Sequence, residues 1–216
     1  MAVYTSPNDG STLDSFLRSG ATTTNENTNA ENKVGEHNAI ADAYRTLIQF
    51  PGIQAGVLGV VSTAFLYMKI YLDRSSNART MRVFRIKRDV VITQVTWNIW
   101  KTGSNWSTAG GFHADDCEQT DIGSIDLTAT ETPDTWKSIE LDGTAIQEIV
   151  DGSWTTPTLL IKMDTETDDG YMFYSSNHTT ASNRPYIVVN STILTPVTHV
   201  PRGRVRYPSN ADIRLG

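Results

Sequence analysis

The sequence is poor in cysteine, histidine and charge, and each shortage excludes a class of protein. Its 216 residues contain one cysteine, Cys117, which excludes a disulfide framework and a zinc site built from cysteines. The four histidines are scattered, and none lies beside a candidate nucleophile. There is no Gly-x-Ser-x-Gly elbow, no phosphate-binding Gly-Lys-Ser/Thr loop and no His-Glu-x-x-His motif. We therefore predict that the chain is not an enzyme, although its 24 acidic residues leave a glycosidase-type carboxylate pair open.

No stretch is predicted to cross a membrane. Residues 53–72 are almost uncharged and about long enough to span a bilayer, but their second half alternates. One set of alternate positions is aliphatic and the other is aromatic or charged: Ala64, Leu66, Met68, Ile70 and Leu72 against Phe65, Tyr67, Lys69 and Tyr71. A period of two predicts a strand with one core face. Residues 1–10 are polar and lack the basic and then apolar regions of a signal peptide, so we expect synthesis in the cytoplasm without classical secretion.

The net charge of −6 is unevenly distributed along the chain. From residue 201 onward four arginines stand against one aspartate, a net +3 that leaves −9 for the rest. An acidic body lacks the basic face of a nucleic-acid-binding protein, so no nucleic-acid partner is predicted. Arg202, Arg204 and Arg206 alternate, so an extended chain would project them to one side, toward carboxylates of a neighbouring subunit. The alternative for this tail is a disordered, solvated end.

The remaining pattern predicts an all-β fold. Short segments rich in Val, Ile, Tyr, Phe and Trp are joined by stretches rich in Thr, Ser, Asn, Asp and Gly. We expect strands near 15–18, 44–50, 64–72, 81–87, 90–98, 136–141, 158–163, 171–176 and 186–190. Strands 44–50 and 64–72 are predicted to pair in the core, whereas residues 20–35 and 101–123 are predicted to be loops.

One short helix is expected among these strands, over Thr144–Asp151. Thr144 is the expected cap, with Gln147 at the capping-box spacing. The predicted architecture is a jelly-roll-type β-sandwich over residues 14–191, with extended arms at 1–13 and 192–216.

The order of several short segments resembles the DNRLRE domain family. These segments include Asp14–Arg18, Tyr44–Phe50, Thr96-Trp97-Asn98 and Arg184–Val189, and together they cover about residues 14–190. The chain departs from the family after Phe50, where proline stands in place of the usual aspartate. It departs again at residues 141–144, where an Asp-Val-Thr is usual.

The resemblance implies a jelly roll related to carbohydrate-binding modules, which occurs on secreted bacterial proteins and in phage virions. A lone domain with two arms favours a virion structural protein. We expect a capsid decoration (cement) or similar auxiliary subunit, located in the virion and contacting neighbouring subunits as a homo-oligomer. The alternative is a carbohydrate-binding module or fibre tip that recognises a surface glycan, with polysaccharide as its partner.

Two acidic loops are candidate calcium sites. Asp164, Glu166 and Asp168 place oxygen ligands at alternate positions, as Ca²⁺ prefers, although Gly170 falls one place late for an EF-hand. Asp115 and Asp116, with Asp121 nearby, form the second candidate. The alternative is two acidic surface loops that bind nothing. Any calcium would be structural, and no other cofactor is predicted.

Two tryptophans are candidate sugar contacts. Trp106 and Trp154 lie in loop sequence beside glycine and serine, whereas tryptophans within strands more often pack in the core. Burial is the alternative for both of them. Cys117 is expected to be a small packed residue rather than a nucleophile, because no Cys-His motif surrounds it.

Overall fold

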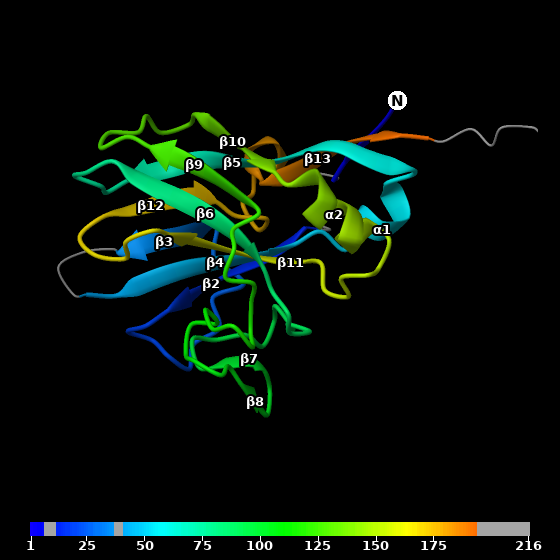
Figure 1. Cartoon of the computed structure of the whole chain (residues 1–216). Helices are drawn as coiled ribbons and strands as arrows, with labels where there is room; N and C mark the ends of the chain where they lie inside the picture. The colour runs from blue at the N-terminus through cyan, green and yellow to red at the C-terminus, as the bar shows by residue number, and fades with distance from the viewer. Residues whose placement is uncertain (7–11, 37–40, 194–216) are drawn as a thin grey trace, which may run out of the picture.

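The structure, a computed structural model, describes residues 1–6, 12–36 and 41–193, and its regular secondary structure is mostly β-strand (Figure 1). The strands are β1 Ala2–Thr5, β2 Leu13–Arg18, β3 Glu31–Glu36, β4 Ala43–Gln49, β5 Val60–Asp73, β6 Arg79–Arg85, β7 Ile99–Lys101, β8 Ser104–Asn105, β9 Gly123–Leu127, β10 Trp136–Leu141, β11 Thr158–Met163, β12 Gly170–Tyr174 and β13 Tyr186–Thr192. The helices are α1 Ile53–Gly56, α2 Gly143–Val150 and the 3₁₀ turn η1 Ala181–Asn183.

Eleven strands form one curled antiparallel sheet. Its order is β1-β13-β5-β12-β3-β4-β11-β6-β9, with β10 paired to β5 and β2 paired to β4 off this path. β9 and β10 also lie against each other, so the sheet closes on itself around a core (Figure 1). β7 and β8 form a separate small hairpin. The all-β class with one short helix of more than a single turn is confirmed, and jelly-roll connectivity stays a prediction.

β5 is the strand around which the sheet turns. Its first part pairs with β13 and its middle with β10, whereas residues 70–73 pair with β12. The predicted pairing of 44–50 with 64–72 is wrong, because β4 pairs instead with β2, β3 and β11. The alternation of side chains identifies which face of a strand is buried, but it carries little information about the partner strand.

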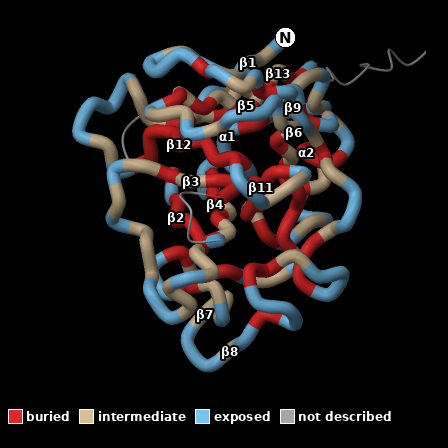
Figure 2. The backbone as a smooth tube through the Cα atoms, turned by 90° about the vertical axis from the view of Figure 1, so that its left-hand side faces the viewer, coloured by how far each residue is buried: buried red, intermediate tan, exposed pale blue. Residues whose placement is uncertain are grey.

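Two hydrophobic clusters lie on opposite faces of the sheet. The larger one fills the inside of the curl with the inward side chains of β5, β10, β11 and β13 and with Ile146 and Ile149 of α2. The smaller one lies under the segment 86–117, where Leu47 and Leu160 pack against Ile86, Val95 and other buried residues. All six residues of β11 are therefore buried, and buried chain fills the middle of the molecule in Figure 2.

The helix α2 forms where predicted, but its capping group differs. Asp142 Oδ1 accepts hydrogen bonds from the backbone N–H groups of Thr144 at 2.7 Å and Ala145 at 3.1 Å. Gln147 does not close a capping box, since its Oε1 accepts from the N–H of Val61. Aspartate is as good an N-cap as threonine, and here it is two residues earlier.

Two loop and strand predictions are corrected. Residues 20–35 are expected to be a loop, but Glu31–Glu36 form β3, in which Asn32 and Val34 face inward while charged residues alternate with them. Residues 90–98, expected to be a strand, contain turns instead, and Gln94 and Val95 donate backbone hydrogen bonds to Val91 O. Buried apolar residues in this segment cover the outer face of the sheet, but the segment does not form backbone hydrogen bonds as a strand of that sheet.

The N-terminal arm expected over residues 1–13 is partly docked on the sheet. β1 pairs with β13 in a register that places Ala2 opposite Ser191 and Thr5 opposite Val188. The arm expected over 192–216 lies almost wholly outside the described residues. Within the part that the structure describes, no helix is long and apolar enough to cross a membrane.

Candidate functional site

Aromatic side chains gather on the outer face of β5, β10 and β13. On β5 the even-numbered residues from Ala64 to Ile70 are fully buried, so the odd-numbered residues point outward. Register places Trp136 opposite Lys69 and Tyr186 opposite Tyr67, on this same outer face. We call the following set the aromatic band: Phe65, Tyr67, Tyr71, Trp136 and Tyr186.

Rings of the band contact one another across the strands. Tyr67 and Tyr186 stack with centroids 4.7 Å apart, and Trp136 meets Tyr186 edge-on at 5.2 Å. Phe65 lies 6.4 Å from Tyr67. Trp136 and Tyr71 keep 38% and 42% of their surface exposed, so the band presents aromatic surface to solvent.

Polar groups border the band at the Tyr71 end. Tyr71 meets Tyr174 edge-on at 5.2 Å, and the Tyr174 hydroxyl donates to Asp134 Oδ1 at 2.9 Å. Lys69 Nζ lies 3.2 Å from Asp134 Oδ1 and donates to Asn183 Oδ1 at 2.8 Å. Hydrogen bonds from Tyr174 and then Lys69 lower the pKa of Asp134. Aromatic surface and fixed hydrogen-bonding groups therefore lie side by side.

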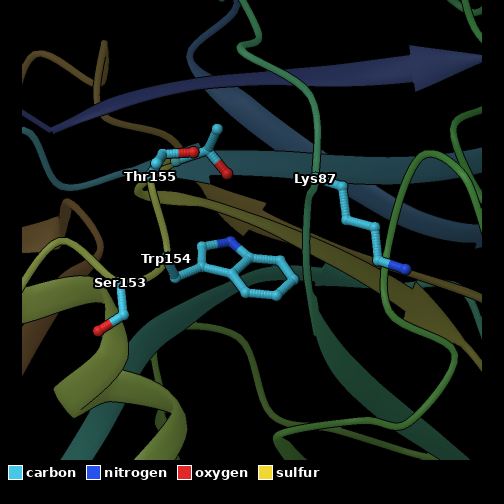
Figure 3. Close-up of a pocket in the computed structure, with 5 residues that line it drawn as sticks. Lys87, Ser153, Trp154 and Thr155 are labelled. Carbon is cyan, nitrogen blue, oxygen red and sulfur yellow. The ribbon is translucent and has the colours of Figure 1, made fainter.

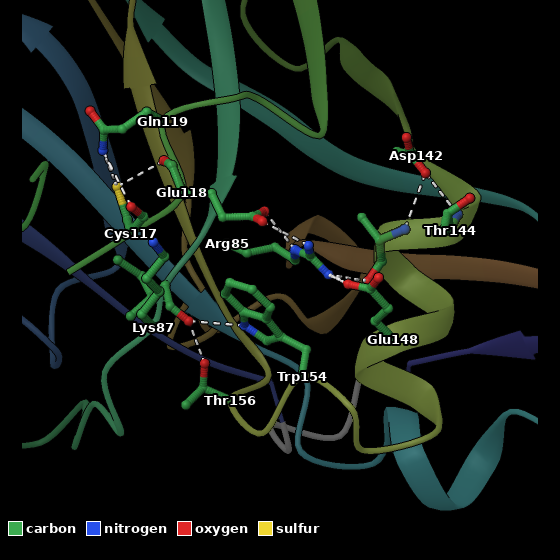
Figure 4. Close-up of polar contacts among 12 residues, drawn as sticks. Arg85, Lys87, Cys117, Glu118, Gln119, Asp142, Thr144, Glu148, Trp154 and Thr156 are labelled. Carbon is green, nitrogen blue, oxygen red and sulfur yellow. Dashed lines mark hydrogen bonds and ion pairs between the residues drawn. The ribbon is translucent and has the colours of Figure 1, made fainter. Parts of the chain in front are cut away.

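A second group of charges surrounds Arg85 at the end of β6 (Figure 4). Arg85 forms a bidentate pair with Glu118, at 2.8 and 2.9 Å, and Nη1 donates to Glu148 at 2.5 Å. Burial would lower the pKa of Arg85, but hydrogen bonds from the guanidinium to both carboxylates outweigh it and raise the pKa. Asp121 and Asp142 line the adjoining hollow, where Asp121 pairs with Arg82 at 2.8 Å and Asp142 caps α2. The carboxylates around Arg85 are thus engaged by arginines or by backbone N–H groups, an arrangement typical of structural contacts.

A pocket of about 190 Å³ lies beside this cluster (Figure 3). Lys87, Ser153, Trp154, Thr155 and Thr156 line it. The Trp154 indole N–H donates to Ile86 O at 3.0 Å, which fixes the plane of the ring.

The family model for the disaggregatase related repeat domain matches residues 14–189, which is most of the chain. The chain belongs to this family. This match corrects the expected membership of the DNRLRE family, because a different family is identified over the same residues. No curated protein sequence matches the chain. The matched region begins within β2 and ends within β13, so β1 lies outside the residues that the family model matches.

The two tryptophans predicted to contact sugar differ in their burial. Trp106 is 5% exposed, and its indole N–H donates to Thr96 O at 3.0 Å within the smaller cluster. A ring buried to this extent offers little surface to a ligand, so the structure gives no support to its predicted role. Trp154 is half-buried and lines the pocket, which is compatible with the predicted role. The aromatic band was missed, although the alternation of residues 64–72 already placed Phe65, Tyr67 and Tyr71 on one face.

The acidic loop at 164–168 does not gather metal ligands. Glu166 forms a bidentate pair with Arg45, at 2.8 and 2.7 Å. Asp164 accepts from the N–H of Thr165 at 2.8 Å, and Asp168 is exposed at a positive φ of 63°. These three carboxylates are therefore separately engaged or turned to solvent.

The other acidic loop is also explained by contacts within the protein. Asp116 is fully buried and pairs with Arg88 at 2.9 Å, and Asp115 is exposed beside His113. Across the residues that the structure describes, no group of three or more His, Cys, Asp or Glu residues could hold a metal ion. The predicted calcium sites are therefore not formed by the described residues. The predicted partner-binding residues Arg202, Arg204 and Arg206 lie outside them.

Proposed function

We propose that this disaggregatase-related repeat domain is a non-enzymatic module that binds polysaccharide through the aromatic band. The exposed rings of Trp136 and Tyr71 are the observation that carries the proposal. The C–H faces of sugar rings pack on aromatic rings, and hydroxyl groups need fixed donors and acceptors. Lys69, Asp134 and Asn183 supply such groups at the border of the band.

A non-enzymatic role agrees with how the carboxylates are engaged. Glycoside hydrolysis needs one carboxyl group that gives up a proton and a second that attacks or activates water. Glu118 and Glu148 come together, but Arg85 occupies both oxygens of Glu118 and one of Glu148.

Retention on insoluble polysaccharides tests the proposal. Trp136→Ala and Tyr71→Ala remove exposed rings and should leave the fold intact, because neither ring lies in the core. Each should weaken binding about three- to tenfold, the range for one aromatic contact. Trp100→Ala is the matched control, since Trp100 lies on the separate β7–β8 hairpin. Binding unchanged in both band variants, or wild-type protein that no polysaccharide retains, would refute the proposal.

A second candidate is a structural subunit that assembles with other copies, as expected for an auxiliary virion protein. Exposed apolar residues at the start of β5 favour it. Val60 pairs with Thr192, and Leu58 and Ile193 adjoin that pair; these three side chains are 48% (Val60), 61% (Leu58) and 54% (Ile193) exposed. A concentrated apolar patch of this kind marks a protein contact more often than a free surface.

Light scattering separates the two candidates. An oligomer that Val60→Asp converts to monomers, with polysaccharide retention unchanged, would favour the structural subunit. A monomeric wild-type protein at working concentrations contradicts assembly through this patch. The location in a virion stays a prediction.

A further inference from the structure

The indole of Trp154 is held rigidly from one side. The guanidinium carbon of Arg85 lies 4.0 Å from the ring centroid, and Arg85 is itself fixed by Glu118 and Glu148 (Figure 4). The indole N–H is bound to Ile86 O. A ring fixed in this way does not lose conformational freedom when a ligand packs on it, which favours binding.

The pocket beside the ring carries an unmatched positive charge. Lys87 lies across the hollow from the indole (Figure 3), and its Nζ donates to Ala114 O at 2.7 Å. None of the five lining residues is acidic, and no described carboxylate pairs with Lys87. Two acids lie two residues from the lining in sequence: Asp151 accepts from the N–H and hydroxyl of Ser153, and Asp89 is exposed to solvent.

We propose that this pocket takes a carboxylated sugar residue, with the sugar ring against Trp154 and the carboxylate at Lys87. Its volume of about 190 Å³ is below the ~300–1,000 Å³ typical of pockets for drug-sized ligands, which suits a single sugar unit. Thr155 and Thr156 line the same space, and the Thr156 hydroxyl donates to Ile86 O. The inference rests on the proposed polysaccharide binding but concerns a surface other than the aromatic band, and it names acidic polysaccharides as the ligand class.

The indole N–H resonance of Trp154 provides a direct test. Methyl glucuronoside and methyl glucoside are titrated into the ¹⁵N-labelled full chain, and Trp154→Phe assigns the signal. The glucuronoside should shift the Trp154 signal and bind about fivefold more tightly than the glucoside, as one partly exposed ion pair allows. Added salt should reduce that preference.

Lys87→Gln is the decisive variant. It should bring glucuronoside binding to the level of the glucoside, whereas Lys101→Gln should change nothing. Lys101 is the matched control, because its Nζ also lies near an indole, 4.4 Å from the ring centroid of Trp100. Equal binding of the two glycosides by wild type, no shift at Trp154, or a preference kept by Lys87→Gln would overturn the inference. Retention of neutral polysaccharide by the wild type would show that the proposed function survives such a failure.

Discussion

Replacing Asp14 with asparagine should flatten the dependence of stability on pH. Asp14 lies on β2 and is 2% exposed, with Oδ2 accepting from the N–H of Ser176 at 2.7 Å. Burial raises the pKa of this carboxyl to about 6, and hydrogen bonds to it offset burial only in part. The folded state therefore holds the proton of Asp14 more tightly than the unfolded chain does.

The pH dependence of stability follows in sign and size from the pKa of Asp14 in the folded state and in the unfolded chain. The protonated form is favoured by folding, so this contribution to stability is full below the unfolded pKa of about 3.9 and is lost as pH rises through about 6. A shift of about 2 pKa units corresponds to about 3 kcal/mol at 1.36 kcal/mol per unit. Asparagine is neutral at every pH, and its side-chain oxygen can still accept from Ser176.

Urea unfolding of wild type and Asp14→Asn at about pH 4 and pH 7 measures the effect. Between those pH values the wild type should lose about 2 kcal/mol relative to the variant, less than the full ~3 kcal/mol because Asp14 of the unfolded chain is already about half ionised at pH 4. Asp89→Asn, at an exposed position, is the control and should follow the wild type. Parallel pH profiles for wild type and Asp14→Asn would refute the reasoning, because they would mean that Asp14 titrates alike in the folded and unfolded states.

Three further predictions concern the core of β5, the Cys117 thiol and the Asp169 carboxylate. Leu66→Ala and Met68→Ala remove fully buried side chains and should each cost about 2–5 kcal/mol in urea unfolding, whereas a loss below about 0.5 kcal/mol at both would contradict the assigned core face. Burial raises the pKa of the Cys117 thiol to about 11, so a thiol reagent at neutral pH should label the unfolded chain and spare the folded one. Burial would raise the pKa of Asp169, but hydrogen bonds from residues 76 and 77 outweigh it and lower the pKa to about 2. Asp169→Ala should therefore lower the free energy of unfolding by about 3 kcal/mol at neutral pH. This difference from the wild type should shrink as the pH falls from about 4 to 2.

Strand faces could be predicted from the sequence, and strand partners could not. The alternation of residues 64–72 correctly separates Leu66 and Met68, inside, from Phe65 and Tyr67, outside. The same alternation fits pairing with any neighbouring strand, and β5 takes β10, β12 and β13, which lie far along the chain. β3 was hidden because its only aliphatic residue is Val34.

The candidate sites were only partly predictable for a related reason. Trp106 and Trp154 have similar neighbours in sequence, yet one covers the sheet and the other lines a pocket. What separates them is Arg85, which packs on Trp154 from a strand some seventy residues away. The aromatic band likewise needs Trp136 and Tyr186 to be brought to Tyr67 by register. Such meetings are properties of the fold rather than of local sequence.

The pairing of β1 with β13 has a mechanical consequence. Ala2 lies opposite Ser191, so the two described ends of the chain, at residues 1 and 193, leave the sheet side by side. A force that pulls these ends apart acts across the ladder and opens its hydrogen bonds one at a time, beginning with the pair at Ala2. β1 should therefore peel away at low load, while β5, held by three other strands, stays in place. Tension would lengthen the molecule by this segment before it disturbs the aromatic band or the Trp154 pocket.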